Sequence, residues 1–233
     1  MPPPQPSRIA IAGLRHAYGR GVNRREILHG LDMQFEPGEI VIILGPSGSG
    51  KSTFLTLTGA LRSVQEGSVR VGGVELNGAT MGQLTSIRRG IGFIFQTHNL
   101  LASLNCRENI QISMACDPQE TAASAKDKAT RALAQVGLAQ LGDAWPHELS
   151  VGQRQRVAVA RALVHSPGII LADEPTASLD RINARAVLEL LHGHARQRGC
   201  TILLVTHDHR IVEAADRVLL LEDGTLNPEL KLA

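Results

Sequence analysis

The chain has 233 residues, of which 43% are hydrophobic and 20% are charged. This composition favours one large domain with a substantial core and argues against disorder across the body of the chain. The formal net charge is only +2, so no whole-chain field would attract a polyanion, and we expect no nucleic-acid partner.

Three further features bear on the compartment and on membrane association. The three cysteines, Cys106, Cys116 and Cys200, are far apart and form no CxxC pair, which favours reduced thiols in a cytosolic protein. No apolar run approaches the roughly twenty residues of a membrane helix. The Pro-rich start also lacks the basic and apolar regions of a signal peptide. If the protein works at a membrane, another subunit must span it.

Strand-like and helix-like patterns alternate along the chain. Residues 1–8 and 228–233 are predicted to be tails, the first of them disordered, around a single domain over residues 9–227. Strands are predicted at Ile9–Leu14, Ile27–Phe35, Glu39–Leu44, Ile91–Gln96, Ile169–Ala172 and Thr201–Thr206, with hairpins over Gly67–Leu76 and Arg217–Leu226. Helices are predicted at Lys51–Leu61, Asn109–Ala115, Ala122–Val136, Val151–Val164, Ile182–Gln197 and Ile211–Ala215.

This order of elements predicts the fold class. The segment 97–165 is rich in Ala, Gln and Leu without strand-like runs, so we expect a helical insert subdomain there. The strands on either side of it alternate with helices, which implies a mostly parallel central sheet covered on both faces. With an antiparallel β part at the N-terminus, the prediction is an α/β fold.

A phosphate-binding loop follows one buried strand. The segment Gly45–Ser52 fits G-x-x-x-x-G-K-[ST] between a strand and a helix, which predicts a P-loop NTPase. Glycines allow successive backbone N–H groups to face phosphate oxygens, and the helix N-terminus adds partial positive charge. Lys51 is expected at the β- and γ-phosphates, Ser52 on Mg²⁺ and Thr53 at an adjacent phosphate. The predicted nucleotide-binding residues of the loop are Gly45, Pro46, Ser47, Gly48, Ser49, Gly50, Lys51, Ser52 and Thr53.

Two acids end the apolar strand Ile169–Ala172. A buried strand of such a fold delivers its last residues to the sheet edge at which ligands bind. Asp173 is therefore predicted to hold Mg²⁺ through its water shell, and Glu174 to orient the water that attacks the γ-phosphate. A solvated strand end is the alternative interpretation of this pair.

Two more polar residues end predicted strands. His207 follows Thr201–Thr206 and could hydrogen-bond the γ-phosphate or the attacking water, or could be a structural histidine. Gln96 ends IGFIFQ and could complete the Mg²⁺ shell, or could be only the polar end of a strand.

The segment LSVGQRQR, residues 149–156, closely resembles the signature of ABC (ATP-binding cassette) proteins, usually written LSGGQ. Other parts stand in that family's order. Tyr18 resembles the aromatic residue that stacks on adenine, Gln96 matches the Q-loop, Ser178-Leu179-Asp180 matches the D-loop, and His207 matches the switch histidine. The resemblance covers about residues 8–226 and implies an ATPase that uses ATP and Mg²⁺, with Glu174 and His207 catalytic.

The resemblance also implies a second copy. Ser150 and Gly152 stand at a predicted helix start, which favours anions. By resemblance, Ser150, Gly152, Gln153 and Asp180 would help bind ATP held by another subunit, so that two cassettes enclose two ATP molecules head to tail. Val151 replaces the usual first glycine of the signature; it either points away from nucleotide or changes the closing geometry.

IGFIFQ followed by HNLLASLNCRENI resembles the ATPases of lipoprotein-release, macrolide-export and heterocyst glycolipid-export systems. That resemblance implies a bacterial peripheral protein on the cytoplasmic face of the inner membrane. Its permease would dock at Asn99–Ile112, unless that segment serves only helix packing, and would reach a periplasmic adaptor. The cargo would be a lipid, glycolipid, lipoprotein, peptide or drug. Alternatives are an ATP-gated regulatory clamp of the cell-division type and a soluble ABC ATPase.

Overall fold

The computed structural model describes residues 9–177 and 179–227. The two predicted tails, residues 1–8 and 228–233, lie outside the described residues, as does Ser178 of the predicted D-loop. Among the described residues, no helix is both long and apolar enough to cross a membrane.

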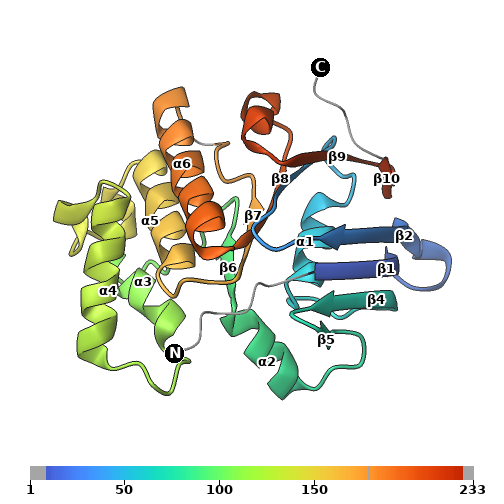
Figure 1. The fold of residues 1–233 in the computed structure, drawn as a ribbon, viewed down its shortest axis with the longest axis horizontal. Helices are drawn as coiled ribbons and strands as arrows, with labels where there is room; N and C mark the ends of the chain where they lie inside the picture. Colours follow the sequence, from blue (N-terminus) through green and yellow to red (C-terminus); the bar gives the residue numbers. More distant parts are fainter. Residues whose placement is uncertain (1–8, 178, 228–233) are drawn as a thin grey trace.

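A six-stranded sheet forms the centre of the fold (Figure 1). Its strand order is β10-β9-β3-β8-β7-β6, and neighbouring strands are parallel except in the hairpin β9–β10. The hairpin predicted over Arg217–Leu226 turns at Asp223 and Gly224. The strands are β3 (Ile40–Leu44), β6 (Ile91–Ile94), β7 (Ile169–Asp173), β8 (Thr201–Thr206), β9 (Arg217–Glu222) and β10 (Thr225–Asn227).

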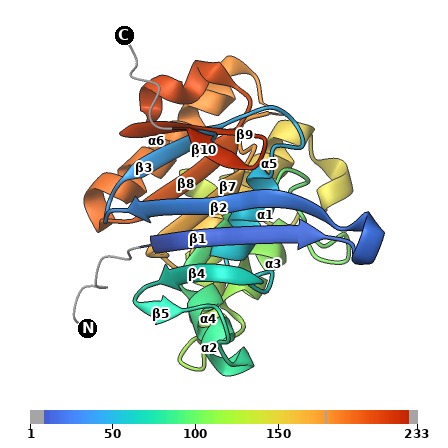
Figure 2. The same cartoon turned by 90° about the vertical axis from the view of Figure 1, so that its right-hand side faces the viewer.

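A second, antiparallel sheet of order β2-β1-β4-β5 stands at the front in Figure 2. Its strands are β1 (Ile9–Tyr18), β2 (Arg25–Phe35), β4 (Glu66–Val71) and β5 (Val74–Glu75). β1 continues past its predicted end at Leu14 because an irregularity around Gly13, whose φ is 58°, lets the pairing resume. A hydrogen bond of 2.9 Å from the His29 amide to the Gly224 carbonyl ties this sheet to the hairpin of the central one.

The central sheet separates two hydrophobic cores. Alternate residues of a strand point to opposite faces, so Ile42 and Leu44 of β3 face one core while Val41 and Ile43 face the other. Helix α1 (Lys51–Thr58) packs in the core shared with the antiparallel sheet. Helices α5 (Val151–Leu163) and α6 (Arg181–Arg198) pack in the other core. Helices α1 and α5 therefore cover opposite faces of the central sheet (Figure 1).

Residues 95–168, between β6 and β7, contain helices and no strand in the described structure. The helices are α3 (Cys106–Gln111), α4 (Ala122–Gln135) and α5, with short 3₁₀ turns at Ile112–Met114, Ala139–Leu141 and Pro146–Glu148. The predicted helix Asn109–Ala115 was placed too late in the chain. It begins earlier because Asn105 and Glu108 form a reciprocal capping box, which fixes the start of α3.

Helix α2 (Met81–Arg89) was not predicted from the sequence. None of its residues is fully buried, so its apolar stripe is weak. Thr80 and Gln83 form a capping box at its start. The local signal was therefore the T-x-x-Q spacing and not a hydrophobic periodicity.

Two predicted elements end earlier in the structure, and a third is a different type of helix. Helix α1 stops at Thr58 instead of Leu61 because Ala60 adopts a left-handed φ of 57°. Strand β6 stops at Ile94, which places Gln96 in the following turn. The predicted helix Ile211–Ala215 is a 3₁₀ helix over His209–Ala214.

Candidate functional site

The loop between β3 and α1 has a shape that only glycine permits at two positions. Gly50 is the N-cap of α1 with a φ of 104°, and a Cβ there would lie 2.8 Å from Leu28 Cδ2. A Cβ on Gly45 would lie 2.2 Å from the Leu221 carbonyl oxygen. Both glycines therefore allow the loop to pass close to neighbouring strands and to turn into the helix start.

Lys51 sits within this loop and is 8% exposed. Its Nζ donates hydrogen bonds to the carbonyl oxygens of Gly45 at 2.6 Å and Pro46 at 2.9 Å. Burial lowers the pKa of Lys51, while the carboxylates of Glu174 and Asp173 oppose that shift. The loop thus holds a cation directly at the start of α1, where the helix dipole also favours an anion.

The rest of the loop leaves groups available for a ligand. Pro46, Ser47 and Gly48 are exposed at its crest. The Ser49 hydroxyl is buried and has no hydrogen-bond partner among the described residues. An unpaired buried hydroxyl is costly, and a phosphate oxygen would satisfy it. The side-chain oxygens of Tyr18 and Thr53 lie 3.1 Å apart, which links the end of β1 to the first turn of α1.

Asp173, at the end of β7, interacts with the Ser52 side chain in the first turn of α1. Burial raises the pKa of Asp173 and the neighbouring Glu174 adds to the rise, while Ser52 and Lys51 act in the opposite direction. A hydroxyl and a half-buried carboxylate form an oxygen donor set of the kind that Mg²⁺ prefers. Gln96 is exposed in the turn after β6.

Glu174 and His207 are brought into direct contact. Glu174 Oε1 accepts a hydrogen bond of 3.0 Å from the His207 amide and lies 2.6 Å from His207 Nδ1. Glu174 Oε2 accepts a bond of 2.7 Å from the Thr206 hydroxyl. The left-handed backbone of Glu174, with a φ of 50°, turns the chain out of β7. The carboxylate is therefore held against the end of β8, next to the histidine that was predicted to share its site.

The signature residues form the start of α5. Ser150 is its N-cap: Ser150 Oγ accepts from the Gln153 amide at 3.2 Å, and Gln153 Oε1 accepts from the Ser150 amide at 2.8 Å. Gly152 lies against Leu179, since a Cβ there would be 3.3 Å from Leu179 Cδ2. Val151 is 45% exposed, so its branched side chain meets no tight packing within its own chain.

Asp180 also serves as a helix cap. Its carboxylate accepts hydrogen bonds from the amide and the side chain of Asn183 at the start of α6, and these bonds lower the pKa of Asp180. This cap connects the predicted D-loop to α6, and the contact of Leu179 with Gly152 connects it to the signature helix α5.

Two residues that support the site were missed at the level of sequence. Thr206 holds Glu174; its signal was a polar residue ending a buried strand directly before His207. Gln155 is buried, and its Nε2 donates to the Pro175 carbonyl at 2.8 Å, which connects α5 to the loop after Glu174. The sequence feature that could have identified Gln155 is its position on the same helix face as the apolar residues Val159 and Ala162.

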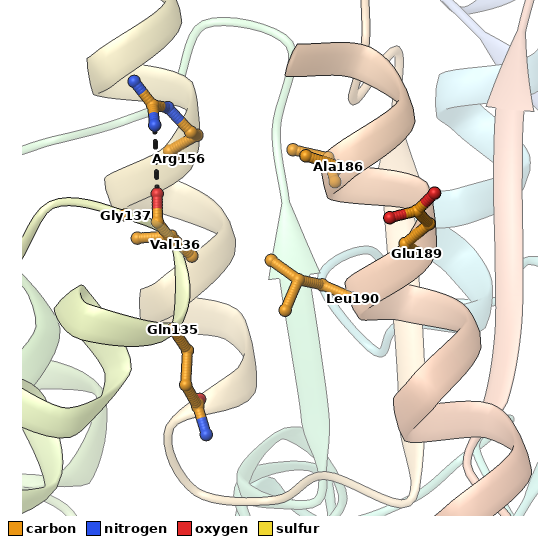
Figure 3. Close-up of a pocket in the computed structure, with 8 residues that line it drawn as sticks. Gln135, Val136, Gly137, Arg156, Ala186, Glu189 and Leu190 are labelled. Carbon is orange, nitrogen blue, oxygen red and sulfur yellow. Dashed lines mark hydrogen bonds between the residues drawn. The ribbon is translucent and has the colours of Figure 1, made fainter. Parts of the chain in front are cut away.

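A cavity of about 420 Å³ lies away from these residues, between the helical subdomain and α6 (Figure 3). Leu190 and Ala186 line its α6 side, and Val136 and Arg156 the other, where Arg156 donates to the Val136 carbonyl at 3.1 Å. None of the predicted nucleotide or metal residues lines this cavity.

The fold and site define a P-loop nucleoside triphosphatase: a parallel sheet, a glycine-shaped loop between β3 and a helix start, and two acids at the end of β7, which is separated from β3 by β8. The model of the ABC transporter family matches residues 28–177, and the chain belongs to this family. It is an ABC-type ATPase, and the predicted fold class is confirmed.

Known proteins of this family resemble the chain closely. A macrolide export ATP-binding/permease protein MacB of Aeromonas hydrophila is 42% identical over 224 residues, which are 94% of this chain and 34% of that protein. A lipoprotein-releasing system ATP-binding protein LolD of Rhodopseudomonas palustris is 38% identical over 220 residues, 94% of this chain and 97% of that protein. The chain therefore spans about a third of one relative and nearly all of the other.

Among solved structures, the ATP-binding cassette MJ0796 superposes with a TM-score of 0.91 and 34% identity, covering 97% of this chain and 99% of the other. That cassette was solved as a dimer in a post-hydrolysis state bound to ADP and Pi.

Proposed function

We propose that the chain acts as one half of an ATP-gated dimer that drives a membrane permease for export. The observation that carries this proposal is the placement of α1 and α5 on opposite faces of the central sheet. Lys51 lies at the start of α1 and Ser150 at the start of α5, so the two residues belong to helices on opposite faces of the central sheet. A second copy, placed head to tail, would bring the Ser150 of one chain to the phosphates held by the other.

The names of the relatives support both parts of this proposal. MJ0796 is described as a dimeric bacterial ABC transporter cassette. MacB is named for macrolide export, and LolD for lipoprotein release. Two cassettes closed on ATP and opened by hydrolysis differ in free energy, and that difference can move a bound partner.

Within each site, the residues of this chain would divide the work. Lys51, the Ser49 hydroxyl and the backbone N–H groups of the loop would hold the phosphates. Ser52 and Asp173, with Gln96 on closure, would hold Mg²⁺, which would neutralise phosphate charge. Glu174 would orient the attacking water, and His207, which contacts its carboxylate, would hold the water or the γ-phosphate.

The signature and D-loop residues would complete the site of the other copy. Ser150, Gly152 and Gln153 would face the γ-phosphate across the dimer interface, with the α5 dipole adding attraction for the anion. Asp180 would take part from the start of α6, which is joined to α5 through Leu179 and Gly152.

Replacing Ser150 with Ala should impair hydrolysis much more than ATP binding by the monomer. Loss of one hydrogen bond to a charged group predicts a rate lower by about 10- to 100-fold, while the Kd of the monomer for ATP stays within about twofold. Steady-state ATPase assays and calorimetry measure the two quantities.

The substitution also removes the N-cap of α5, which costs about 1 kcal/mol of stability. The matched control is Thr121→Ala, which removes the N-cap of α4. It should lower the Tm comparably and leave hydrolysis unchanged. Equal losses of binding and hydrolysis in Ser150→Ala would contradict a site shared between two copies.

The permease would dock on the segment Asn99–Ile112. Leu101 and Ile112 are exposed there. Arg161 fixes the start of this segment by donating to the carbonyls of His98 at 2.7 Å and Asn99 at 2.6 Å. The chain would then act as a peripheral protein on the cytoplasmic face of a bacterial inner membrane. The permease would select the cargo, whether a lipid, glycolipid, lipoprotein, peptide or drug, and would reach any periplasmic adaptor.

Replacing Leu101 with Asp should weaken capture of the permease without changing ATP hydrolysis by the purified chain, because a charge at a buried contact carries a desolvation cost. The measurement is co-purification from detergent-solubilised membranes, with mass spectrometry of the captured proteins and lipids. Val22→Asp, in the fully exposed turn between β1 and β2, is the matched control. Recovery of the native chain with no integral membrane protein would overturn the transporter assignment.

A further inference from the structure

Tyr18 is held on three sides by groups from different segments. The guanidinium carbon of Arg62 lies over its ring, 4.9 Å from the centroid. The ring of His16 meets it edge-on at 5.1 Å with an interplanar angle of 81°. Its hydroxyl is bonded to Thr53, 3.1 Å away in the first turn of α1. The Tyr18 residue nevertheless remains 39% exposed, so part of the ring is open to solvent.

The segment that carries Arg62 is fastened to the strand that carries Tyr18. After α1 ends, the amides of Leu61 and Arg62 both donate to the Thr56 carbonyl, which turns the chain back. The Gln65 side chain then pairs with both backbone groups of Ala17, at 2.9 Å and 3.0 Å. Arg62 therefore reaches the Tyr18 ring from a fixed base.

His16 supports the ring as a neutral group. It lies two residues before Tyr18 on β1 and is 3% exposed, and neither ring nitrogen has a hydrogen-bond partner among the described residues. Burial lowers the pKa of His16, and the positive charge of Arg62 lowers it further. The charge that acts on the Tyr18 ring is therefore that of Arg62.

We propose that Arg62 is a positioning residue of the nucleobase subsite: its guanidinium covers one face of Tyr18 and presents the other face to the base. A cation over an aromatic face is attracted by the ring quadrupole and limits rotation of the ring. The base then stacks on a surface that is already oriented, so less ordering is needed on binding. This inference rests on the proposed function and on the role that the family resemblance implies for Tyr18, which is stacking on adenine.

Replacing Arg62 with Ala should weaken binding of ATP and leave binding of inorganic tripolyphosphate unchanged, because only ATP has a base. Loss of an exposed cation–π contact should raise the Kd for ATP by roughly two- to fivefold. Arg62→Lys keeps a cation and should recover much of the loss. Calorimetry of the full chain without added divalent cation measures both ligands while preventing hydrolysis.

Two further variants make the outcomes separable. Arg70→Ala removes an exposed arginine paired with Glu75 on the neighbouring strand and controls for the change in net charge. Tyr18→Ala should raise the Kd for ATP more than Arg62→Ala does, since stacking of a base on an aromatic ring is worth about fivefold or more.

An unchanged Kd for ATP in Arg62→Ala, beside an impaired Tyr18→Ala, would overturn the role of Arg62 alone. Tighter ATP binding in Arg62→Ala would also overturn it, because the guanidinium would then obstruct the base. If Tyr18→Ala weakened binding of ATP and of tripolyphosphate equally, Tyr18 would not be the platform for adenine, and the role of Arg62 would be overturned with it.

Discussion

Replacing Lys51 with Ala should abolish measurable nucleotide affinity. The Lys51 ammonium is buried in the loop and donates to the Gly45 and Pro46 carbonyls, so it lies at the start of α1 before any ligand binds. Hydrogen bonds to charged groups are worth about 1.5–3 kcal/mol each. Loss of two such bonds to the phosphates raises the Kd for ATP roughly 100-fold or more. Calorimetry with ATP is the direct measurement.

The control for this experiment must separate lost contacts from lost folding. Lys126→Ala removes an exposed lysine of α4, a helix that also tolerates alanine well, and should leave the Kd for ATP unchanged. Lys51→Met fills much of the same volume without a charge and should fail to bind as Lys51→Ala does. An unchanged Kd for ATP in both Lys51 variants, with normal thermal unfolding, would contradict the phosphate-loop assignment.

Replacing Glu174 with Gln should stop hydrolysis while preserving ATP binding, and should trap a dimer. The amide oxygen of Gln can accept the two bonds from His207, and its NH₂ group can donate to the Thr206 hydroxyl, which also has acceptor lone pairs. The local structure is therefore kept, while the negative charge needed to polarise water is lost. General-base catalysis contributes about 100- to 10,000-fold to a rate, and turnover should fall by that factor.

Light scattering with Mg²⁺ and ATP should then show a particle of twice the mass, which ADP does not produce. Glu189→Gln, on the exposed face of α6 and paired with Arg185 at the surface, should hydrolyse ATP at the native rate. Native turnover in Glu174→Gln would refute the catalytic assignment. A strictly monomeric Glu174→Gln saturated with ATP would instead count against the shared site.

Local patterns predicted much of the fold. The apolar runs of β3, β7 and β8 indicated strands, and the glycines of Gly45–Ser52 indicated the loop before α1. Helix α2 was missed because its apolar stripe has no fully buried residue, and α3 was misplaced because its start depends on a cap at Asn105. A search for hydrophobic periodicity detects a helix by its apolar stripe. It therefore misses a helix with a weak stripe and does not register a polar capping residue.

The candidate site was predictable where one short segment holds the chemistry. Lys51 follows from its spacing to the glycines, and Asp173 and Glu174 from their position after an apolar strand. Their partners were harder to foresee. Thr206 reaches Glu174 only because β8 lies next to β7, and Arg62 reaches Tyr18 only because the chain turns back after α1.

The amino-acid order alone therefore specified the phosphate loop, the acids and the signature, because each depends on residue types within a single turn or strand. Folding decided which of these groups meet. The strand order of the central sheet puts Glu174 beside His207, and packing in two separate cores places α1 and α5 on opposite faces of that sheet. Such contacts join residues far apart along the chain, and local periodicity carries no information about strand order.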